Sequence, residues 1–168
     1  MPEFVLRPMI AADLPAVLAV QAQCYGSALL EGADALASRL ALSPTTCWVA
    51  ASDNKLAAYL FTHVWPAASL PPWNGLLART WTDDDALTWF VHDMAVAPVG
   101  RGAGLAARLY EAARGAAIDI GLTTSRLIAV QSAGAYWRRL GYAPMDVGVH
   151  ADKLATYGDD ALLMGCRI

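Results

Sequence analysis

The chain has 168 residues, of which 57% are hydrophobic and 16% are charged, and its formal net charge is −3. This length predicts a single domain over residues 1–168, and the acidic balance argues against nucleic-acid binding, which needs a basic surface. No run of about 18 uncharged apolar residues predicts a membrane span, and the first residues lack the basic and apolar regions of a secretory signal.

Hydrophobic periodicity in the first half of the chain predicts both kinds of regular structure. Leu14, Val17 and Leu18 follow Asp13 at helical spacing, and an aspartate before such a run is a typical N-cap. Polar residues 52–55 separate two apolar runs and have hairpin length. The expected elements are a strand at residues 4–6, a helix after Asp13, a helix from Asp34 through Leu40 that stops at Ser43-Pro44, and strands at residues 46–51 and 56–65.

Residues 66–85 interrupt this regularity. The segment contains three prolines and a glycine, carries Trp73 and Trp81, and ends in Asp83-Asp84-Asp85. A loop of this length in a compact domain is usually functional or disordered. The tryptophans indicate that it packs on another part of the chain.

Strands and helices then alternate in the second half. Leu105, Leu109, Ala112, Ala116 and Ile120 repeat at helical spacing, and the glycine that follows them at position 121 is a typical C-terminal stop. The expected elements are a strand at residues 87–96, a helix from Gly104 to Gly121, a strand at 126–130, a helix at 133–140, and closing strands at 142–149 and 161–168.

Val96 to Ala106 joins a strand to a helix through a glycine-rich turn. Gly100, Gly102 and Gly104 allow a close backbone approach to a ligand and unusual dihedral angles. The first N–H groups of a helix lack internal partners and carry partial positive charge. Both properties suit the binding of a diphosphate.

The same glycines fit a plain turn, a Walker loop or a dinucleotide fold less well. A plain turn from strand to helix needs one glycine, and this segment has three. A Walker loop requires Lys and then Ser or Thr, whereas Leu105 follows Gly104. Gly102, Gly104 and Ala107 fit the loose dinucleotide motif, but the next strand ends in Val130-Gln131, without the acidic residue that holds a ribose.

Two motifs and the order of elements resemble the GNAT superfamily of N-acetyltransferases. The family's acetyl-CoA motif is Arg or Gln, two residues, Gly, one residue, then Gly or Ala, and Arg101, Gly104 and Ala106 match it. A second motif, an aromatic pair, three residues, Gly and an aromatic, is matched by residues 136–142. The resemblance covers nearly the whole chain.

The resemblance implies an α/β fold with a mixed, mostly antiparallel sheet, flanked by helices and splayed between strands four and five. The pantetheine arm of acetyl-CoA would lie in that gap and pair with main chain, while amides of the glycine-rich turn hold the pyrophosphate. The residues implied to bind the cofactor are Met94, Ala95, Val96, Arg101, Gly102, Ala103, Gly104, Leu105, Ala106, Gln131 and Trp137.

The implied reaction is direct attack by a primary amine of a small molecule or peptide on the thioester of acetyl-CoA. Such an amine has a pKa of about 10.4, so near pH 7.4 only about one molecule in a thousand is neutral, and a general base would help. His92 is the candidate base because it lies close to the expected reaction centre, and the arylalkylamine branch of the family has a matching His. Asp93 is the candidate for binding the substrate cation, although a regular strand turns it to the opposite face from His92; a bulge would change this.

Two positions depart from the family pattern. Val130 stands where the family often has an Asn that touches the cofactor, and Trp137 where a Tyr often protonates the leaving thiolate. An indole N–H is a donor but not a useful acid, so Tyr136, Tyr142 and Tyr157 are the candidates for that role. The departures leave a second hypothesis open, a non-catalytic GNAT-like module that binds acyl-CoA as a sensor or interaction domain.

The remaining residues bear on location, metals and partners. Cys24, Cys47 and Cys166 form no CxxC pair and are expected to be free thiols in a reducing cytoplasm. His63 and His150 are isolated, so no metal site is expected. The three aspartates that end the long loop could meet a cationic amine or simply cap a helix. The loop itself would help to choose the substrate, and the apolar composition would suit a homodimer.

Overall fold

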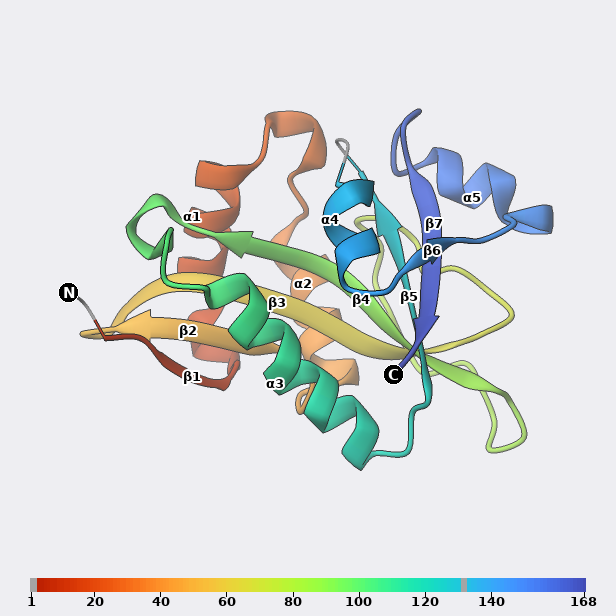
Figure 1. The fold of residues 1–168 in the computed structure, drawn as a ribbon, viewed down its shortest axis with the longest axis horizontal. Helices are drawn as coiled ribbons and strands as arrows, with labels where there is room; N and C mark the ends of the chain where they lie inside the picture. Colours follow the sequence, from red (N-terminus) through yellow and green to blue (C-terminus); the bar gives the residue numbers. More distant parts are fainter. Residues whose placement is uncertain (1–2, 131–132) are drawn as a thin grey trace.

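The computed structural model describes residues 3–130 and 133–168 and forms a seven-stranded sheet with helices on both faces (Figure 1). The strands lie in the order β1-β2-β3-β4-β5-β7-β6, and only the β4–β5 pair is parallel. The predicted mixed, mostly antiparallel α/β sheet is therefore confirmed. The strands are β1 (Val5–Pro8), β2 (Trp48–Ser52), β3 (Lys55–Pro66), β4 (Leu87–Val96), β5 (Thr124–Ala129), β6 (Ala143–Pro144) and β7 (Leu162–Arg167).

The helices divide between the two faces of the sheet (Figure 1). One hydrophobic cluster lies between the sheet and the first two helices, and another lies under the third and fourth. No helix of the described residues is long and apolar enough to cross a membrane. The α-helices are α1 (Leu14–Cys24), α2 (Ala33–Leu42), α3 (Leu105–Asp119), α4 (Gly134–Arg139) and α5 (Ala151–Ala155), and the 3-10 turns are η1 (Ala11–Asp13), η2 (Ser27–Leu29), η3 (Pro98–Gly100) and η4 (Gly148–His150).

The sheet opens between β4 and β5. Trp89, Phe90 and Val91 are the residues of β4 that pair with β5. Beyond Val91 the two strands continue to Val96 and Ala129 without pairing. The predicted splay between the fourth and fifth strands is confirmed, and Figure 1 shows the two arrows diverging.

A β-bulge interrupts β4 at the level of this gap. Phe61 on β3 lies opposite Asp93, but its neighbour Thr62 lies opposite Val91. His92 is therefore the extra residue of the bulge. In a bulge, the two adjacent side chains need not point to opposite faces of the sheet.

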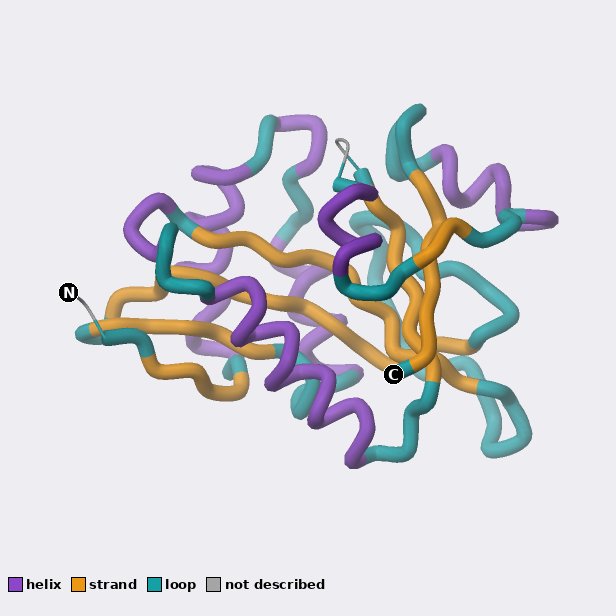
Figure 2. Tube along the Cα trace, viewed as in Figure 1, coloured by secondary structure: helices purple, strands orange, loops and turns teal. Residues whose placement is uncertain are grey.

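The hairpin and the long loop lie where the sequence predicts them. Asp53 and Asn54 adopt φ values of 50° and 63° in the turn between β2 and β3, as the favoured two-residue hairpin turn requires. Residues 67–86 form no helix or strand between β3 and β4, and Figure 2 shows this loop in teal. Trp81 packs against Trp65 with ring centroids 5.8 Å apart, so the loop is tied to the sheet.

Local expectations fail at two places. The predicted strand at 142–149 is wrong, because only Ala143–Pro144 pairs and η4 and α5 follow. Pro144 lacks an N–H for a ladder, and the Asp146 carboxylate accepts from the N–H of Gly148 at 3.0 Å, which closes a turn. Asp13 does precede α1, but its side chain does not cap that helix; it accepts instead from Arg7 and from the N–H of Ile10.

The buried face of α3 differs slightly from the predicted one. Leu105 and Leu109 are buried as expected, and the face continues through Ala113 and Ala117. Ile120 lies past the end of the helix and is half exposed. Because the helix period is 3.6 residues, positions four apart remain on one side over these turns.

Candidate functional site

The turn between β4 and α3 depends on its glycines in two different ways. A Cβ atom on Gly100 would lie 2.8 Å from Leu105 Cδ1, so this position is closed by packing. Gly102 and Gly104 have φ values of 83° and 68°, which other L-residues rarely adopt. A Cβ atom on either would meet no described atom within 4 Å, so the space in front of them is open.

This turn presents a row of unpaired amides. Among the backbone hydrogen bonds of the described residues, none has an N–H of Gly102 through Ala107 as its donor. The N–H of Arg101, which was expected to belong to the row, donates to the carbonyl of Pro98 at 3.3 Å. Amides at a helix N-terminus, together with the helix dipole, favour a bound phosphate. The open space and the unpaired amides of this turn therefore have the geometry that suits an anion.

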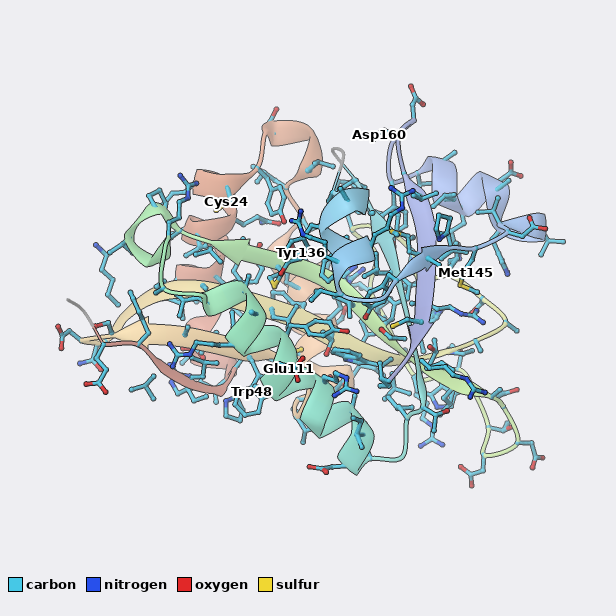
Figure 3. The ribbon with its side chains drawn as sticks, in the orientation of Figure 1. Cys24, Trp48, Glu111, Tyr136, Met145 and Asp160 are labelled. Carbon is cyan, nitrogen blue, oxygen red and sulfur yellow. The ribbon has the colours of Figure 1, made fainter. Side chains whose placement is uncertain are left out.

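A cavity of ≈ 250 Å³ fills the gap between β4 and β5. Its walls come from the end of α1, from both diverging strands and from α4. Figure 3 shows Tyr136 on α4 beside this gap. The cavity is lined by Tyr25, Val91, His92, Asp93, Met94, Leu127, Ile128, Ala129, Val130, Ala133, Tyr136 and Trp137.

The edge of β4 that faces the gap can be assigned from the ladder. The N–H of Ala97 donates to the carbonyl of Ala57 on β3 at 2.8 Å. Main-chain groups alternate between the two edges of an antiparallel strand, so those of Ala95 face β3 and those of Met94 and Val96 face the gap. Of the three residues expected to pair with pantetheine, Met94 and Val96 therefore turn their main-chain groups toward the gap, and Ala95 does not.

The end of α1 lies against the same edge. The hydroxyl of Tyr25 donates to the Met94 carbonyl at 2.8 Å, and the Cys24 thiol donates to the Val96 carbonyl at 3.3 Å. These contacts fix the carbonyls of the edge and leave its N–H groups for a ligand.

His92 and Asp93 both line the cavity, although the sequence predicted opposite faces. The bulge is the physical reason, since it adds a residue between the two registers of β3 and β4. The Asp93 carboxylate accepts from the Tyr59 hydroxyl at 2.8 Å. Burial raises the pKa of Asp93, and this outweighs the neighbouring groups that lower it.

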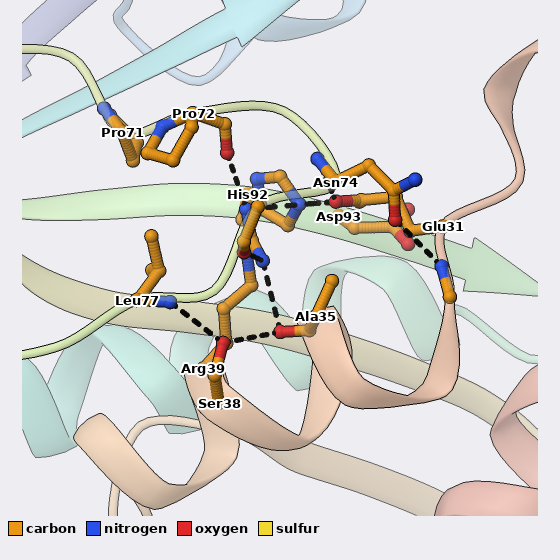
Figure 4. A network of polar contacts seen from close by, with 12 residues as sticks. Glu31, Ala35, Ser38, Arg39, Pro71, Pro72, Asn74, Leu77, His92 and Asp93 are labelled. Carbon is orange, nitrogen blue, oxygen red and sulfur yellow. Dashed lines mark hydrogen bonds and ion pairs between the residues drawn. The ribbon is translucent and has the colours of Figure 1, made fainter.

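His92 is paired with a residue that the sequence analysis did not single out. Glu31 Oε1 lies 2.5 Å from His92 Nε2, and the side chains of His92 and Glu31 are 2% and 3% exposed (Figure 4). Glu31 lies between η2 and α2, in a segment without periodicity. Its only signal in the sequence is a charge next to Leu30 in an otherwise apolar stretch.

Further contacts hold Glu31 in place (Figure 4). Its Oε2 accepts from the N–H of Asn74 at 2.9 Å and lies 3.6 Å from Arg39 Nη2. Its own N–H and carbonyl bond to the side-chain amide of Gln21 at 3.0 and 3.1 Å. Burial works to raise the pKa of Glu31, but its contact with His92, the Arg39 guanidinium and the N–H of Asn74 outweigh burial, so the pKa is lowered.

The aromatic candidates occupy different places. Tyr136 and Trp137 line the cavity, whereas Tyr142 does not. The Tyr142 hydroxyl is buried between those of Tyr110, at 3.0 Å, and Ser125, at 2.6 Å. Burial raises the pKa of Tyr136, so its hydroxyl stays protonated at neutral pH. Gln131, another expected cofactor contact, lies outside the described residues.

A second, smaller cavity of ≈ 60 Å³ continues from the first past His92 and Asp93. It leads toward the long loop through Trp73 and toward α5 through Tyr157. Its other wall residues are Tyr25, Leu29, Glu31, Ile128 and Val130. The two cavities meet at the bulge, so a ligand from each side could reach the same atoms.

Comparison of the sequence with family models gives one match. The model of the acetyltransferase (GNAT) family matches residues 14–142. No curated protein sequence matches the chain significantly.

Comparison with solved structures finds the same fold over the whole chain. The ribosomal-protein-S18-alanine N-acetyltransferase from Escherichia coli has a TM-score of 0.68 at 18% identity, over 99% of this chain and 94% of that one. The polyamine N-acetyltransferase from Drosophila melanogaster has a TM-score of 0.68 at 13% identity, over 99% of both chains. Naa50 from Arabidopsis thaliana, in complex with a bisubstrate analogue, has a TM-score of 0.63 at 11% identity, over 98% of this chain and 99% of that one.

Proposed function

The chain belongs to the acetyltransferase (GNAT) family, and from this premise we propose that it transfers the acetyl group of acetyl-CoA to a primary amine of a small molecule or peptide. The observation that carries the proposal is the row of unpaired amides from Gly102 to Ala107 at the start of α3. This row follows the end of β4, beside the cavity between β4 and β5. A diphosphate on the amides would direct the rest of a coenzyme A molecule along the gap.

The cofactor would bind along one edge of β4. The N–H groups of Met94 and Val96 face the gap and can pair with the amides of pantetheine. Trp137 closes the far wall of the cavity, on α4. Val130 also lines the cavity, so the position where the family often has Asn is in reach of the cofactor but offers no side-chain polar group.

The chemical step would take place at the bulge. His92 accepts a proton from the attacking amine, whose nitrogen then bonds to the thioester carbonyl carbon. N–H groups of the β4 edge stabilise the oxyanion of the tetrahedral intermediate. The C–S bond breaks as the carbonyl re-forms, and Tyr136 donates its proton to the leaving thiolate. The nitrogen then loses its second proton, which passes through solvent and restores the Tyr136 hydroxyl. We assign this role to Tyr136 because Tyr136 lines the cavity, whereas the Tyr142 hydroxyl is held by Tyr110 and Ser125.

The amine would enter from the second cavity. Asp93 supplies a carboxylate at the junction of the two cavities, and Tyr25, Trp73 and Tyr157 supply aromatic walls. Carboxylates and aromatic faces both attract cations. Trp73 belongs to the loop after β3, which supports a role for that loop in choosing the substrate. The similar structures include enzymes named for a protein alanine and for polyamines, so both acceptor types remain in the proposal.

We also place the protein in the cytoplasm. Cys24, Cys47 and Cys166 are free thiols, and Cys47 is fully buried with a pKa that burial raises to about 12. Such a thiol is unreactive and suits a reducing compartment.

Release of free coenzyme A thiol tests the proposed function. The purified chain is incubated with acetyl-CoA and a panel of small amines and short peptides, and thiol is measured over time. Thiol release that depends on an amine, with acetylated amine as product, supports the enzyme. Saturable acetyl-CoA binding without release for any acceptor would instead support the sensor or interaction module, and absence of binding would exclude both.

A further inference from the structure

We propose that Glu31 is the positioning residue of His92: it holds the ring proton on Nε2, leaves the Nδ1 lone pair free for the acceptor amine, and ties the base to the long loop through Asn74. This inference rests on the proposed function. It adds a residue from the connection between η2 and α2 to a proposed site whose base and acid lie on β4 and α4.

The tautomer follows from the donors and acceptors around the ring. An ionised carboxylate can only accept hydrogen bonds, so the His92 Nε2 that lies 2.5 Å from Glu31 Oε1 must carry a proton. In the neutral ring the lone pair is then on Nδ1. Among the described residues, His92 Nδ1 is a buried atom without a hydrogen-bond partner. A buried polar atom left unpaired is costly, and an acceptor amine or its proton would satisfy it.

The second carboxylate oxygen of Glu31 fixes its orientation. Oε2 faces two groups that can only donate, the N–H of Asn74 and the guanidinium of Arg39. Arg39 is itself held by the carbonyls of Gly75 and Pro72, at 3.1 and 2.8 Å, in the long loop. The loop that reaches the amine cavity through Trp73 is therefore anchored on the same carboxylate that orients the base.

Glu31→Gln is a sharp test because these donors decide how the new amide lies. The amide oxygen must face Asn74 and Arg39, which leaves the NH₂ group against His92 Nε2. Nε2 then becomes an acceptor and the ring proton moves to Nδ1, where it blocks the lone pair. Glu31→Asp keeps an acceptor-only carboxylate and should keep the Nε2–H tautomer, although the shorter side chain loosens its hold. Glu111→Gln, the same change on an exposed glutamate of α3, is the matched control.

The experiment reads the tautomer directly, by two-bond proton–nitrogen NMR on the full chain labelled with ¹⁵N-histidine. We expect Nε2–H at His92 in the wild type, Glu31→Asp and Glu111→Gln chains, and Nδ1–H in Glu31→Gln. With the best acceptor of the panel, Glu31→Gln should lose about a hundredfold or more in kcat, with an unchanged acetyl-CoA Kd. Loss of both kcat and acetyl-CoA binding would show a merely structural role and overturn the proposal.

The readout does not depend on turnover. An Nδ1–H tautomer in the wild type, or an Nε2–H tautomer kept in Glu31→Gln, would overturn the positioning role even in an active enzyme. If Glu31→Gln does not fold, the wild type and Glu31→Asp decide, and an Nδ1–H tautomer in either one contradicts the proposal. If the wild-type chain releases no thiol with any acceptor, the proposed function is wrong. The tautomer of His92 still tests the positioning role of Glu31 in that case.

Discussion

His92 and Asp93 are adjacent in the sequence, yet their side chains line the same cavity. In a regular strand, neighbours point to opposite faces of the sheet. Here Phe61 pairs with Asp93 and Thr62 with Val91, so one extra residue of β4 is accommodated at this level. The bulge places an imidazole and a carboxylate together where β4 leaves β5, and it does so without any loop.

The imidazole of this pair gives the first prediction. Replacing His92 with Ala removes the proposed base, so we expect the rate at neutral pH to fall by about a hundredfold or more. Acetyl-CoA affinity should not change, because the amides proposed to hold the diphosphate lie beyond the end of β4. Steady-state rates between pH 6 and 10 measure the effect. A pH–rate profile that matches the wild type would remove His92 from the mechanism.

Replacing Tyr136 should lower the rate less than replacing His92 does, and the loss should depend differently on pH. A thiol has a pKa of about 8.5, so near pH 7 protonating the leaving thiolate is worth only about 2 kcal/mol. We therefore expect Tyr136→Phe to lower kcat by no more than about thirtyfold. The defect should shrink as pH rises above about 8.5, where the thiolate leaves without a proton. Rates with one good acceptor across this range provide the test, and a defect of constant size would exclude proton donation by Tyr136.

The sequence predicted the parts of the site that depend on local pattern. Three glycines after an apolar strand indicated the amide row before α3, since positive φ values and free helix amides are local properties. The only sign of the bulge in the sequence is the adjacent polar pair His92 and Asp93 in a mainly apolar strand. Whether the register shifts there depends on how β3 pairs, which no single segment determines.

Glu31 could not be found in the same way. It lies 61 positions before His92 in the sequence, and it follows η2 in a segment without helical or strand periodicity. Its position depends on the Gln21 amide and on the fold of the long loop. The strand predicted at 142–149 is wrong because a local pattern was present but did not decide the structure. Val147 and Val149 alternate with polar or small residues as in a strand, whereas the turn at Asp146 prevents pairing.

The two ends of α3 offer a matched pair of glycine variants for the amide row. Gly104 and Gly121 both have positive φ values, 68° and 92°, and a Cβ atom at either would meet no described atom within 4 Å. Alanine at each position should therefore cost a similar 1–2 kcal/mol, an approximate value for left-handed backbone. Only Gly104→Ala puts a methyl group where the diphosphate would bind, so only it should weaken acetyl-CoA binding, by about tenfold or more.

Thermal unfolding with and without acetyl-CoA measures both effects. At about 100 times its Kd, the ligand should add about 2.7 kcal/mol to the stability of the wild type, or roughly 5–10 °C in Tm for a chain of this length. The increase in Gly121→Ala should match that of the wild type, and the increase in Gly104→Ala should be smaller at the same concentration. Equal increases in all three chains would contradict the assignment of the amide row.

The Arg7–Asp13 ion pair before α1 is expected to affect stability and not activity. Both terminal guanidinium nitrogens of Arg7 bond to the carboxylate at 2.8 Å, and the N–H of Ile10 adds a contact at 2.9 Å. The Arg7 hydrogen bond is the main cause that lowers the pKa of Asp13. A lowered pKa means that the stabilisation is present above the unfolded value of about 3.9 and is lost as pH falls through the folded value.

Asp13→Asn tests whether the ion pair loses its stabilising effect as pH falls. Because the Arg7 side chain is 42% exposed, solvent screens the pair, and we expect a loss of only about 1 kcal/mol at pH 7. For this chain length that corresponds to about 2–4 °C in Tm. The difference between the variant and the wild type should narrow as pH falls below about 3.9, since the wild-type carboxylate is then being protonated. Asp119→Asn, at the exposed end of α3, is the control, and a difference at Asp13 that stays constant from pH 7 to pH 3 would show that packing, and not the ion pair, supports this turn.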